Sequence, residues 1–394
     1  MKNADDIVIV SGVRTAIGTL GGSLKNIHQG DLGATVIREA VSRAKIDPAM
    51  VDEVIVGNVG QIAESGFIGR ICQLRAGLPE ATTAYSVNRQ CGSGLQAVAN
   101  GLMQIQTEQV DIVVACGTEN MSQLPYYVRQ GRYGYNMGDG KLEDGLVSIL
   151  TWPEGPYHNG MTAENVADRF NVSREEMDDF SASSQKKVAQ AIEAGFFIDE
   201  IVPITVNVNR KEIKIFDTDE HPRLVDREKL ATLRPAFKKD GSVTAANSSG
   251  INDGAAAVVM MKRSKALELG LKPRITIRGW AVAGCSPDIM GFGPSPATKK
   301  LLKKFNLTHD EIDLYEINEA FAAQAIAVIK DLGIDEQKVN VNGGAIALGH
   351  PVGATGTILT VKMMYEMERR DAKTGIITMC IGGGQGISML FERG

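Results

Sequence analysis

The sequence predicts an α/β fold in which one structural unit occurs twice. Short apolar runs typical of buried strands alternate with helix-like segments along most of the 394 residues. Strands that alternate with helices in this way predict a parallel sheet whose two faces are both covered. The pattern of the first 116 residues also returns in the last third of the chain. A chain of this length usually exceeds one hydrophobic core, so two or three domains are expected.

The first copy of the unit is predicted from apolar runs, helical spacing and glycine turns. Its elements are a strand at 7–10, a helix behind an Asp31 cap, strands at 51–56 and 84–88, a helix at 94–106 and a strand at 112–116. The second copy is predicted from runs that begin near residues 275, 312, 341 and 376, each 254 to 267 residues after its counterpart. Four echoes in the same order favour a duplication over chance.

A different segment, residues 119–247, separates the two copies. It contains a long helix predicted behind the capping box Ser173…Glu176 and ending near Gly195. Residues 210–240 hold nine Lys or Arg against seven Asp or Glu, in a chain whose net charge is −5. Taken alone, this stretch is best interpreted as a solvated loop surface.

Composition and charge exclude several classes of function. The acidic balance, without a long basic run, argues against nucleic acid or a membrane surface as the main partner. The apolar runs are too short for a signal peptide or a membrane span. Five scattered cysteines without a CxxC pair predict free thiols in a reducing compartment, so we expect a cytoplasmic protein. The histidines show no mutual metal spacing, so no metal site is expected.

Cys91 is the first candidate for chemistry. It lies in Asn88-Arg-Gln-Cys91-Gly-Ser-Gly94, between a predicted strand end and a helix start. Free amide N–H groups and the helix dipole at such a junction favour a thiolate nucleophile. A buried structural cysteine is the alternative. Gly92-Ser-Gly94-Leu-Gln-Ala97 also fits a dinucleotide fingerprint weakly, but two strands precede it, which argues against that use.

Three further residues lie in segments that suggest catalysis. His350 lies in a loop with five glycines between residues 342 and 356, as expected of a general base held in place, although a histidine that fills a turn is the alternative. Cys380 ends an apolar strand before a run of glycines, whose amides could converge on an oxyanion. Asn318 follows the predicted strand at 314–317 and in isolation is more simply a helix cap.

Together these segments resemble the signature motifs of the thiolases. The nucleophile segment of that family looks like residues 87–97, and three other family signatures match 318–321, 349–351 and 380–386. The resemblance covers nearly the whole chain. It implies two thiolase-type α-β-α-β-α halves with an inserted loop domain, which agrees with the duplication. It also implies condensation of two acetyl-CoA to acetoacetyl-CoA and CoA, or the reverse.

The resemblance further implies a division of the chain and a set of partners. Residues 1–118 with 248–271 would form the first half, 119–247 the loop domain for CoA binding and oligomerisation, and 272–394 the second half. Coenzyme A would be substrate or product, so no cofactor is expected. Acetyl-CoA and 3-ketoacyl-CoA thioesters would be the ligands. The assembly would be a homotetramer or a homodimer.

The resemblance also implies a role for each residue that lies in a matching motif. Cys91 would be acylated, His350 would activate it, and Cys380 would move the α-carbon proton of the second acetyl-CoA. Asn318, through a water, would form one oxyanion hole with His350, and the amides of Cys91 and Gly382 would form the other. The matching CoA-binding positions are Arg223, Ser249, Phe237, His158 and Phe321.

One position departs from the family, and alternatives therefore stay open. Close members of the family read His-Met-Gly where this chain has His158-Asn159-Gly160, so an apolar contact becomes polar. The stretch from residue 144 to 158 also looks longer than in short-chain members. A broader-chain 3-ketoacyl-CoA thiolase is thus the main alternative. A β-ketoacyl synthase-like enzyme or a non-catalytic CoA- or lipid-binding module would not be expected to keep Cys91, His350 and Cys380 together.

Overall fold

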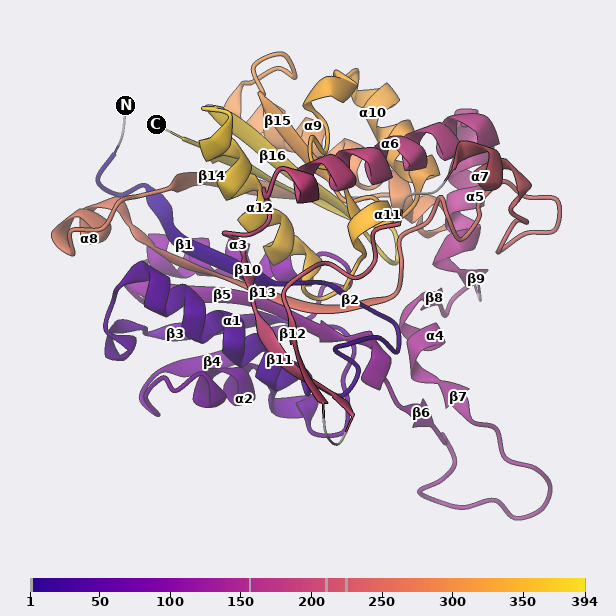
Figure 1. The fold of residues 1–394 in the computed structure, drawn as a ribbon, viewed down its shortest axis with the longest axis horizontal. Helices are drawn as coiled ribbons and strands as arrows, with labels where there is room; N and C mark the ends of the chain where they lie inside the picture. Colours follow the sequence, from indigo (N-terminus) through magenta and orange to yellow (C-terminus); the bar gives the residue numbers. More distant parts are fainter. Residues whose placement is uncertain (1–2, 156, 210–211, 224–225, 394) are drawn as a thin grey trace.

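The chain is built on one eleven-stranded mixed sheet that both halves share (Figure 1). The computed structural model describes residues 3–155, 157–209, 212–223 and 226–393. The strands of the sheet are β1 (Ile7–Thr15), β2 (Gly18–Thr19), β3 (Glu53–Gly57), β4 (Thr83–Val87), β5 (Ile112–Asn120), β10 (Ile201–Val202), β13 (Asn252–Lys262), β14 (Ile275–Gly284), β15 (Leu314–Ile317), β16 (Thr374–Ile381) and β17 (Gln385–Glu392). Their order is β15-β16-β17-β14-β1-β13-β5-β3-β4, with β10 beside β1 and β2 beside β13.

The sheet confirms the predicted duplication. β1 and β14 pair antiparallel at its centre, and on either side the same arrangement follows: β13, β5 and β3 in one half, and β17, β16 and β15 in the other. The expectation of a parallel sheet is right only for the outer pairs β3–β4, β3–β5 and β15–β16 and for the short pair β1–β10. β16 turns back tightly into β17 through Gly382–Gly384, which makes that pair antiparallel and the sheet mixed.

Two local predictions are wrong. Residues 341–342 form a turn and not a strand, because Gly343 adopts a left-handed φ of 73°; the counterpart of β4 is reduced to an isolated bridge between Tyr315 and Val339. Helix α1 (Gln29–Ala44) begins before Asp31, and the side chain of His28 caps it by accepting a hydrogen bond from the Gly30 amide.

The helices of the two halves form three layers around the sheet (Figure 1). They are α1, α2 (Ile68–Arg75), α3 (Ser93–Gln106), α8 (Arg263–Glu268), α9 (Pro294–Phe305), α10 (Ala322–Leu332), α11 (Ala345–Leu348) and α12 (Thr355–Arg369). α1 and α2 pack on the first-half strands, and α9 and α10 pack on the second-half strands. α3 and α12 pack against each other between the two sets of strands. The order is therefore α-β-α-β-α.

Glycine allows the central helices to touch through their backbones. A Cβ atom on Gly356 of α12 would lie 2.1 Å from the backbone nitrogen of Leu95 in α3, and one on Gly94 would lie 2.7 Å from that of Thr357. No side chain fits at such distances, so close backbone approach explains glycine at these two positions. The contact places the N-terminal ends of α3 and α12, and the loops that precede them, side by side.

The segment between the halves contains small elements around two longer helices. They are β6 (Tyr126–Tyr127), β7 (Glu143–Asp144), α4 (Gly145–Ile149), β8 (Thr151–Trp152), β9 (Tyr157–His158), α5 (Asn159–Phe170), α6 (Arg174–Glu193), β11 (Ile204–Asn209), β12 (Glu212–Phe216) and α7 (Arg227–Thr232). The capping box predicted for α6 is confirmed, since Ser173 and Glu176 exchange hydrogen bonds. Residues 210–211 and 224–225 of the charged stretch lie outside the described residues.

An ion cluster attaches the later part of this segment to the first half. Arg14 of β1 is fully buried and donates to both carboxylate oxygens of Asp219, at 2.7 and 2.9 Å, and to Glu200 at 2.7 Å. A bidentate pair of this kind fixes the position of both partners. The loop that carries His221 and Arg223 is therefore held against the sheet. Within the described ranges, no helix is both long and apolar enough to cross a membrane.

Candidate active site

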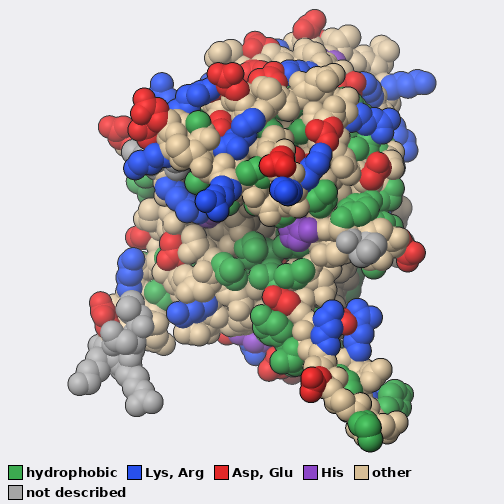
Figure 2. Space-filling view, turned by 90° about the vertical axis from the view of Figure 1, so that its right-hand side faces the viewer, with side chains coloured by type: hydrophobic (Ala, Val, Ile, Leu, Met, Phe, Trp, Pro, Cys, Tyr) green, Lys and Arg blue, Asp and Glu red, His purple; other side chains and the backbone are tan. Residues whose placement is uncertain are grey.

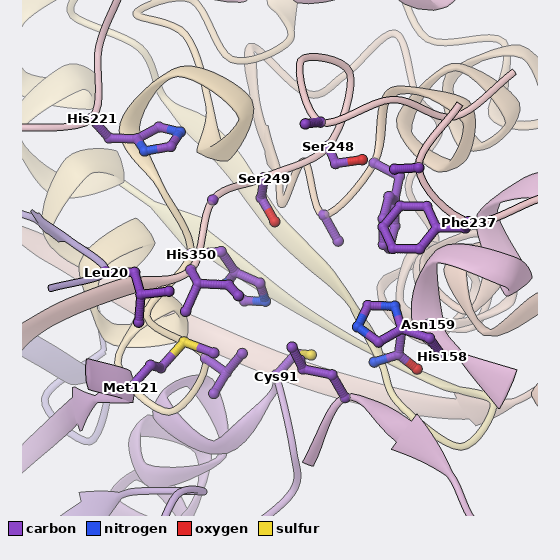
Figure 3. A pocket seen from close by; sticks show the side chains of 18 of the residues that line it. Leu20, Cys91, Met121, His158, Asn159, His221, Phe237, Ser248, Ser249 and His350 are labelled. Carbon is purple, nitrogen blue, oxygen red and sulfur yellow. The ribbon is translucent and has the colours of Figure 1, made fainter. Parts of the chain in front are cut away.

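A cavity of about 520 Å³ lies where the two halves and the inserted segment meet. Seven of the ten site residues expected from the sequence line it: Cys91, His158, Arg223, Phe237, Ser249, Phe321 and His350. Figure 3 labels five of them: Cys91, His158, Phe237, Ser249 and His350. The elements that carry them lie on the side of the molecule shown in Figure 2, where hydrophobic side chains and a histidine surround a hollow and Lys and Arg side chains lie around it. Asn318, Cys380 and Gly382 are not part of the wall.

Cys91 is presented by a tight turn between β4 and α3. Gln90 adopts a left-handed φ of 46°, which is uncommon for a residue with a side chain. The Ser93 hydroxyl stabilises this turn, because it accepts from the Arg89 amide at 2.8 Å and donates to the Gln90 carbonyl at 2.6 Å. Backbone strain held by such contacts is typical of functional sites. Cys91 follows directly and is 5 % exposed, at the floor of the cavity.

The pKa of the Cys91 thiol is governed mainly by its burial. Burial raises the pKa of Cys91 above its ordinary value, and the carboxyl of Glu119 acts in the same direction. The backbone N–H groups of Gly382 and of Cys91 itself lower the pKa but do not outweigh burial. The nucleophile therefore needs a base in the cavity.

His350 is oriented to be that base. Its backbone amide donates to Asn252 Oδ1 at 3.0 Å, and its Nδ1 lies 2.6 Å from Thr355 Oγ1. The Thr355 hydroxyl donates to the Pro351 carbonyl at 2.9 Å, so it can only accept from Nδ1–H. The proton is thus on Nδ1, and Nε2 keeps its lone pair. Burial lowers the pKa of His350 to about 4, so the ring is neutral.

Asn318 lies beside His350 and is not a helix cap. Its Nδ2 is 3.4 Å from His350 Nε2, and α10 begins only at Ala322, with Phe321 as the N-cap residue. The side chain is 1 % exposed, and its Oδ1 has no hydrogen-bond partner among the described residues. A buried amide oxygen without a partner is ready to accept from a water or a ligand.

Cys380 is fully buried in β16, behind the wall of the cavity. It packs with Met290 and Phe321, which do line the cavity. Burial raises the pKa of Cys380 well above its ordinary value, and the neighbouring Cys91 thiol adds to this rise. Gly382 follows in the turn to β17, where its amide reaches the Cys91 thiol. The two cysteines and this amide therefore lie close together.

The five residues expected to bind CoA all line the cavity, and several of them touch one another. The His158 ring stacks on Phe237 at 5.0 Å, and Phe321 meets Phe237 edge-on at 6.1 Å. His158 also caps α5 by accepting from the Gly160 amide, and burial lowers its pKa. The backbone amide of Arg223 donates to Gln185 at 3.0 Å, which holds the loop. These aromatic rings form an apolar wall, which suits the long arm of a CoA thioester.

The structure adds cavity residues that the sequence did not single out. They are Met121, Leu150, His221, Ile251 and Val352. His221 stands two residues before Arg223, so proximity to a motif was the available signal. Asn159, at which the sequence departs from the family, also lines the cavity. The apolar members come from distant segments without such a signal. No cluster of metal-ligating side chains occurs within the described part of the chain.

Comparisons with known proteins agree with this geometry. The sequence model of the thiolase N-terminal domain matches residues 7–264, and that of the C-terminal domain matches residues 271–393. An acetyl-CoA acetyltransferase of Escherichia coli is 50% identical over 397 residues, which cover 100% of both chains. A crystal structure of the Bacillus anthracis acetyl-CoA acetyltransferase has a TM-score of 0.97 and 45% identity, with 98% of each chain covered.

The human mitochondrial 3-ketoacyl-CoA thiolase in complex with CoA is also similar. Its TM-score is 0.95 at 42% identity, and the match covers 100% of this chain and 99% of that one. Two family domains thus account for nearly every described residue, and they divide the chain where the duplicated sheet does. The chain belongs to the thiolase family.

Proposed function

We propose that this chain is an acetyl-CoA C-acetyltransferase, which condenses two acetyl-CoA to acetoacetyl-CoA and free CoA and runs the reverse thiolysis. The observation that carries the proposal is the position of Cys91 and His350 in one cavity, with the Cys380 thiol close to Cys91. Full-length similarity to acetyl-CoA acetyltransferases supports it.

In the first half-reaction, Cys91 is acylated. Nε2 of His350 takes the thiol proton, and the Cys91 sulfur attacks the thioester carbonyl carbon. The carbonyl oxygen becomes an oxyanion, to which the backbone N–H groups of Cys91 and Gly382 donate. The bond to the CoA sulfur then breaks, and the leaving thiolate takes the proton of Cys380. This leaves acetyl-Cys91, an imidazolium at His350 and a thiolate at Cys380.

In the second half-reaction, the Cys380 thiolate removes a proton from the methyl group of a second acetyl-CoA. The His350 imidazolium, with Asn318 acting through a water, donates to the enolate oxygen. The enolate carbon attacks the acetyl carbon, and the bond from that carbon to the Cys91 sulfur breaks. Cys91 takes back its proton from His350, so all three side chains return to their starting states.

The decisive experiment separates the two half-reactions. Cys380→Ala should lose condensation and thiolysis by about 10²–10⁴ fold, the usual effect of removing a general base. It should still exchange acetyl groups between acetyl-CoA and free CoA through Cys91, because a CoA thiolate can leave without taking the Cys380 proton. Cys91→Ala should lose both activities. Cys285→Ala, which removes a thiol outside the cavity, is the control. Condensation by Cys380→Ala at the wild-type rate would contradict the assignment.

A broader 3-ketoacyl-CoA thiolase is the second candidate, and one observation favours it. Cys91 belongs to an apolar cluster with Val59, Met121 and Val352, against which Leu150 packs. Such a lining suits an aliphatic acyl chain on the nucleophile. Thiolysis of 3-ketoacyl-CoAs of rising length will distinguish the two, because the acetyl-specific enzyme should lose kcat/KM beyond four carbons.

We also propose domain bounds, an oligomeric state and a cellular location for the protein. The bounds are those given above: a loop domain at 119–247 between two thiolase halves. Residues 128–142 extend away from the body, and Tyr133 and Met137 on this arm are 92% and 97% exposed (Figure 1). Exposed apolar side chains on a projecting arm support a homotetramer or homodimer. The location that we propose is the cytoplasm, and the role is in fatty acid metabolism. Light scattering of wild type and a Tyr133→Ser variant tests the assembly.

A further inference from the structure

The carboxamide of Asn159 lies in the cavity without a protein partner. Asn159 is the first residue of α5, is 9 % exposed, and lines the cavity with Cys91 and His350. Its side chain forms no hydrogen bond with any residue that the structure describes. The amide faces the cavity, so a water or a group of the substrate can be its partner.

The position of the amide shows which part of the substrate it meets. A Cβ atom on Gly382 would lie 3.8 Å from Asn159 Nδ2. The N–H of Gly382 is itself hydrogen-bonded to the Cys91 thiol. In Figure 3 the amide nitrogen of Asn159 is on the side that faces Cys91, and the oxygen is on the far side. Asn159 thus stands next to the reacting carbon and not along the path to the CoA loop.

The surroundings limit the kind of group that the amide can bind. Among the described residues that line the cavity, Arg223 is the one Lys or Arg. It belongs to the loop held by Asp219, which is expected to bind CoA. A substrate carboxylate beside Asn159 would thus be buried without a cation, which is costly. A neutral carbonyl oxygen that gains charge only during the reaction fits better.

We propose that Asn159 Nδ2 is a third donor to the oxyanion that forms when Cys91 attacks a carbonyl carbon. The inference rests on the proposed function, because it needs an acyl group on Cys91. It makes Asn159 a catalytic residue, in addition to the backbone amides of Cys91 and Gly382. It also accounts for a polar side chain where close members of the family carry methionine.

The proposal predicts how the rate changes on substitution. A donor that acts on developing charge stabilises the transition state more than the bound substrate, so its loss lowers kcat and leaves KM nearly unchanged. Removal of one oxyanion donor costs up to about 10²–10³ fold in other enzymes. With two backbone donors retained, Asn159→Met should acylate roughly tenfold to a hundredfold more slowly. Asn159→Asp, of equal size but without the donor, should be slower still.

The test is single-turnover labelling of Cys91 with radiolabelled acetyl-CoA in wild type and both variants, after circular dichroism has shown that each is folded. Slower labelling in the order wild type, Met, Asp, at unchanged KM, supports the role. Equal labelling rates in wild type and Asn159→Met would overturn it, as would a change seen only with longer acyl-CoAs. Absence of label on wild-type Cys91 would instead contradict the proposed function itself.

Discussion

Thr355 Oγ1 lies 2.6 Å from Nδ1 of His350 and donates its own proton to the carbonyl of Pro351. The hydroxyl is therefore an acceptor for the imidazole, and the lone pair of the ring is directed through Nε2. In a Ser-His-Asp arrangement a carboxylate accepts from Nδ1–H, whereas here the acceptor is the neutral Thr355 hydroxyl. The base is held by this neutral hydrogen bond at Nδ1, by the bond from its backbone amide to Asn252, and by burial.

We expect Thr355→Val to lower kcat by about fivefold to a hundredfold. The isosteric valine leaves Nδ1–H without an acceptor, at a cost of about 1–3 kcal/mol, or lets the proton move to Nε2, which can then no longer accept from Cys91. Thr355→Ser should restore most of the activity, because it keeps the hydroxyl. Steady-state thiolysis of acetoacetyl-CoA across pH measures both. Equal activity of the valine and serine variants would show that the hydroxyl has no role.

The rate of Cys91 alkylation should keep rising with pH beyond 9. Since burial raises the pKa of Cys91 above its ordinary value of 9.0, the thiolate is a minor species at neutral pH, and its fraction grows as pH increases. Iodoacetamide inactivation followed from pH 6 to 10 checks this, with mass spectrometry to locate the label. A plateau below pH 8 would mean that the resting enzyme holds a thiolate after all.

Gly356→Ala should destabilise the whole chain and not one loop. The new Cβ atom would lie 2.1 Å from the backbone nitrogen of Leu95, so α3 and α12 must move apart. Overpacking of this kind costs about 1–3 kcal/mol, and a contact with backbone puts this case at the upper end. Gly66→Ala, whose Cβ would meet nothing within 4 Å, is the matched control. Urea unfolding of the two variants should separate them clearly.

His221 should make the protein less stable as the pH falls. Burial, with Arg223 nearby, lowers its folded pKa to about 4, whereas the unfolded value is near 6.5. The unfolded state then binds more protons between these values, so stability is lost below about pH 6.5, by up to about 1.4 kcal/mol per pH unit. Glu119, whose pKa burial raises to about 8, has the opposite sign. The difference between wild type and His221→Gln in denaturant unfolding at pH 5 and 7 isolates the histidine.

The order of strands and helices in both halves could be predicted, because the patterns that indicate a strand or a helix are local in the sequence. The boundaries of α6 were predictable for the same reason, since Ser173 and Glu176 satisfy their own helix terminus. Cys91 was predicted at a strand–helix junction, and it lies there. The strand predicted at 341–342 is wrong because the left-handed turn at Gly343 depends on packing against α6, through Val188.

The parts of the site that escaped prediction depend on remote contacts. The raised pKa of Cys91 follows from burial among residues such as Met121 and Val352, which come from segments far apart in the chain. The approach of Asn159 to Gly382 joins residues more than two hundred positions apart. The position of Cys380 behind the wall depends on how Met290 and Phe321 pack. Spacing along a sequence does not encode such distances.

The backbone contact between Gly94 and Thr357 has a consequence for how the enzyme tolerates change. The nucleophile precedes one central helix and the base precedes the other, and each belongs to a different copy of the duplicated unit. Their separation is set by close backbone contact at Gly94 and Gly356, together with the hydrogen bond from the Thr357 hydroxyl to the Gly94 carbonyl. Variation elsewhere on α3, as at the 38% exposed Met103, leaves that separation untouched. Substitutions on the surface therefore do not change the distance between the nucleophile and the base. Because each copy supplies only one of the two groups, neither copy could have this chemistry alone.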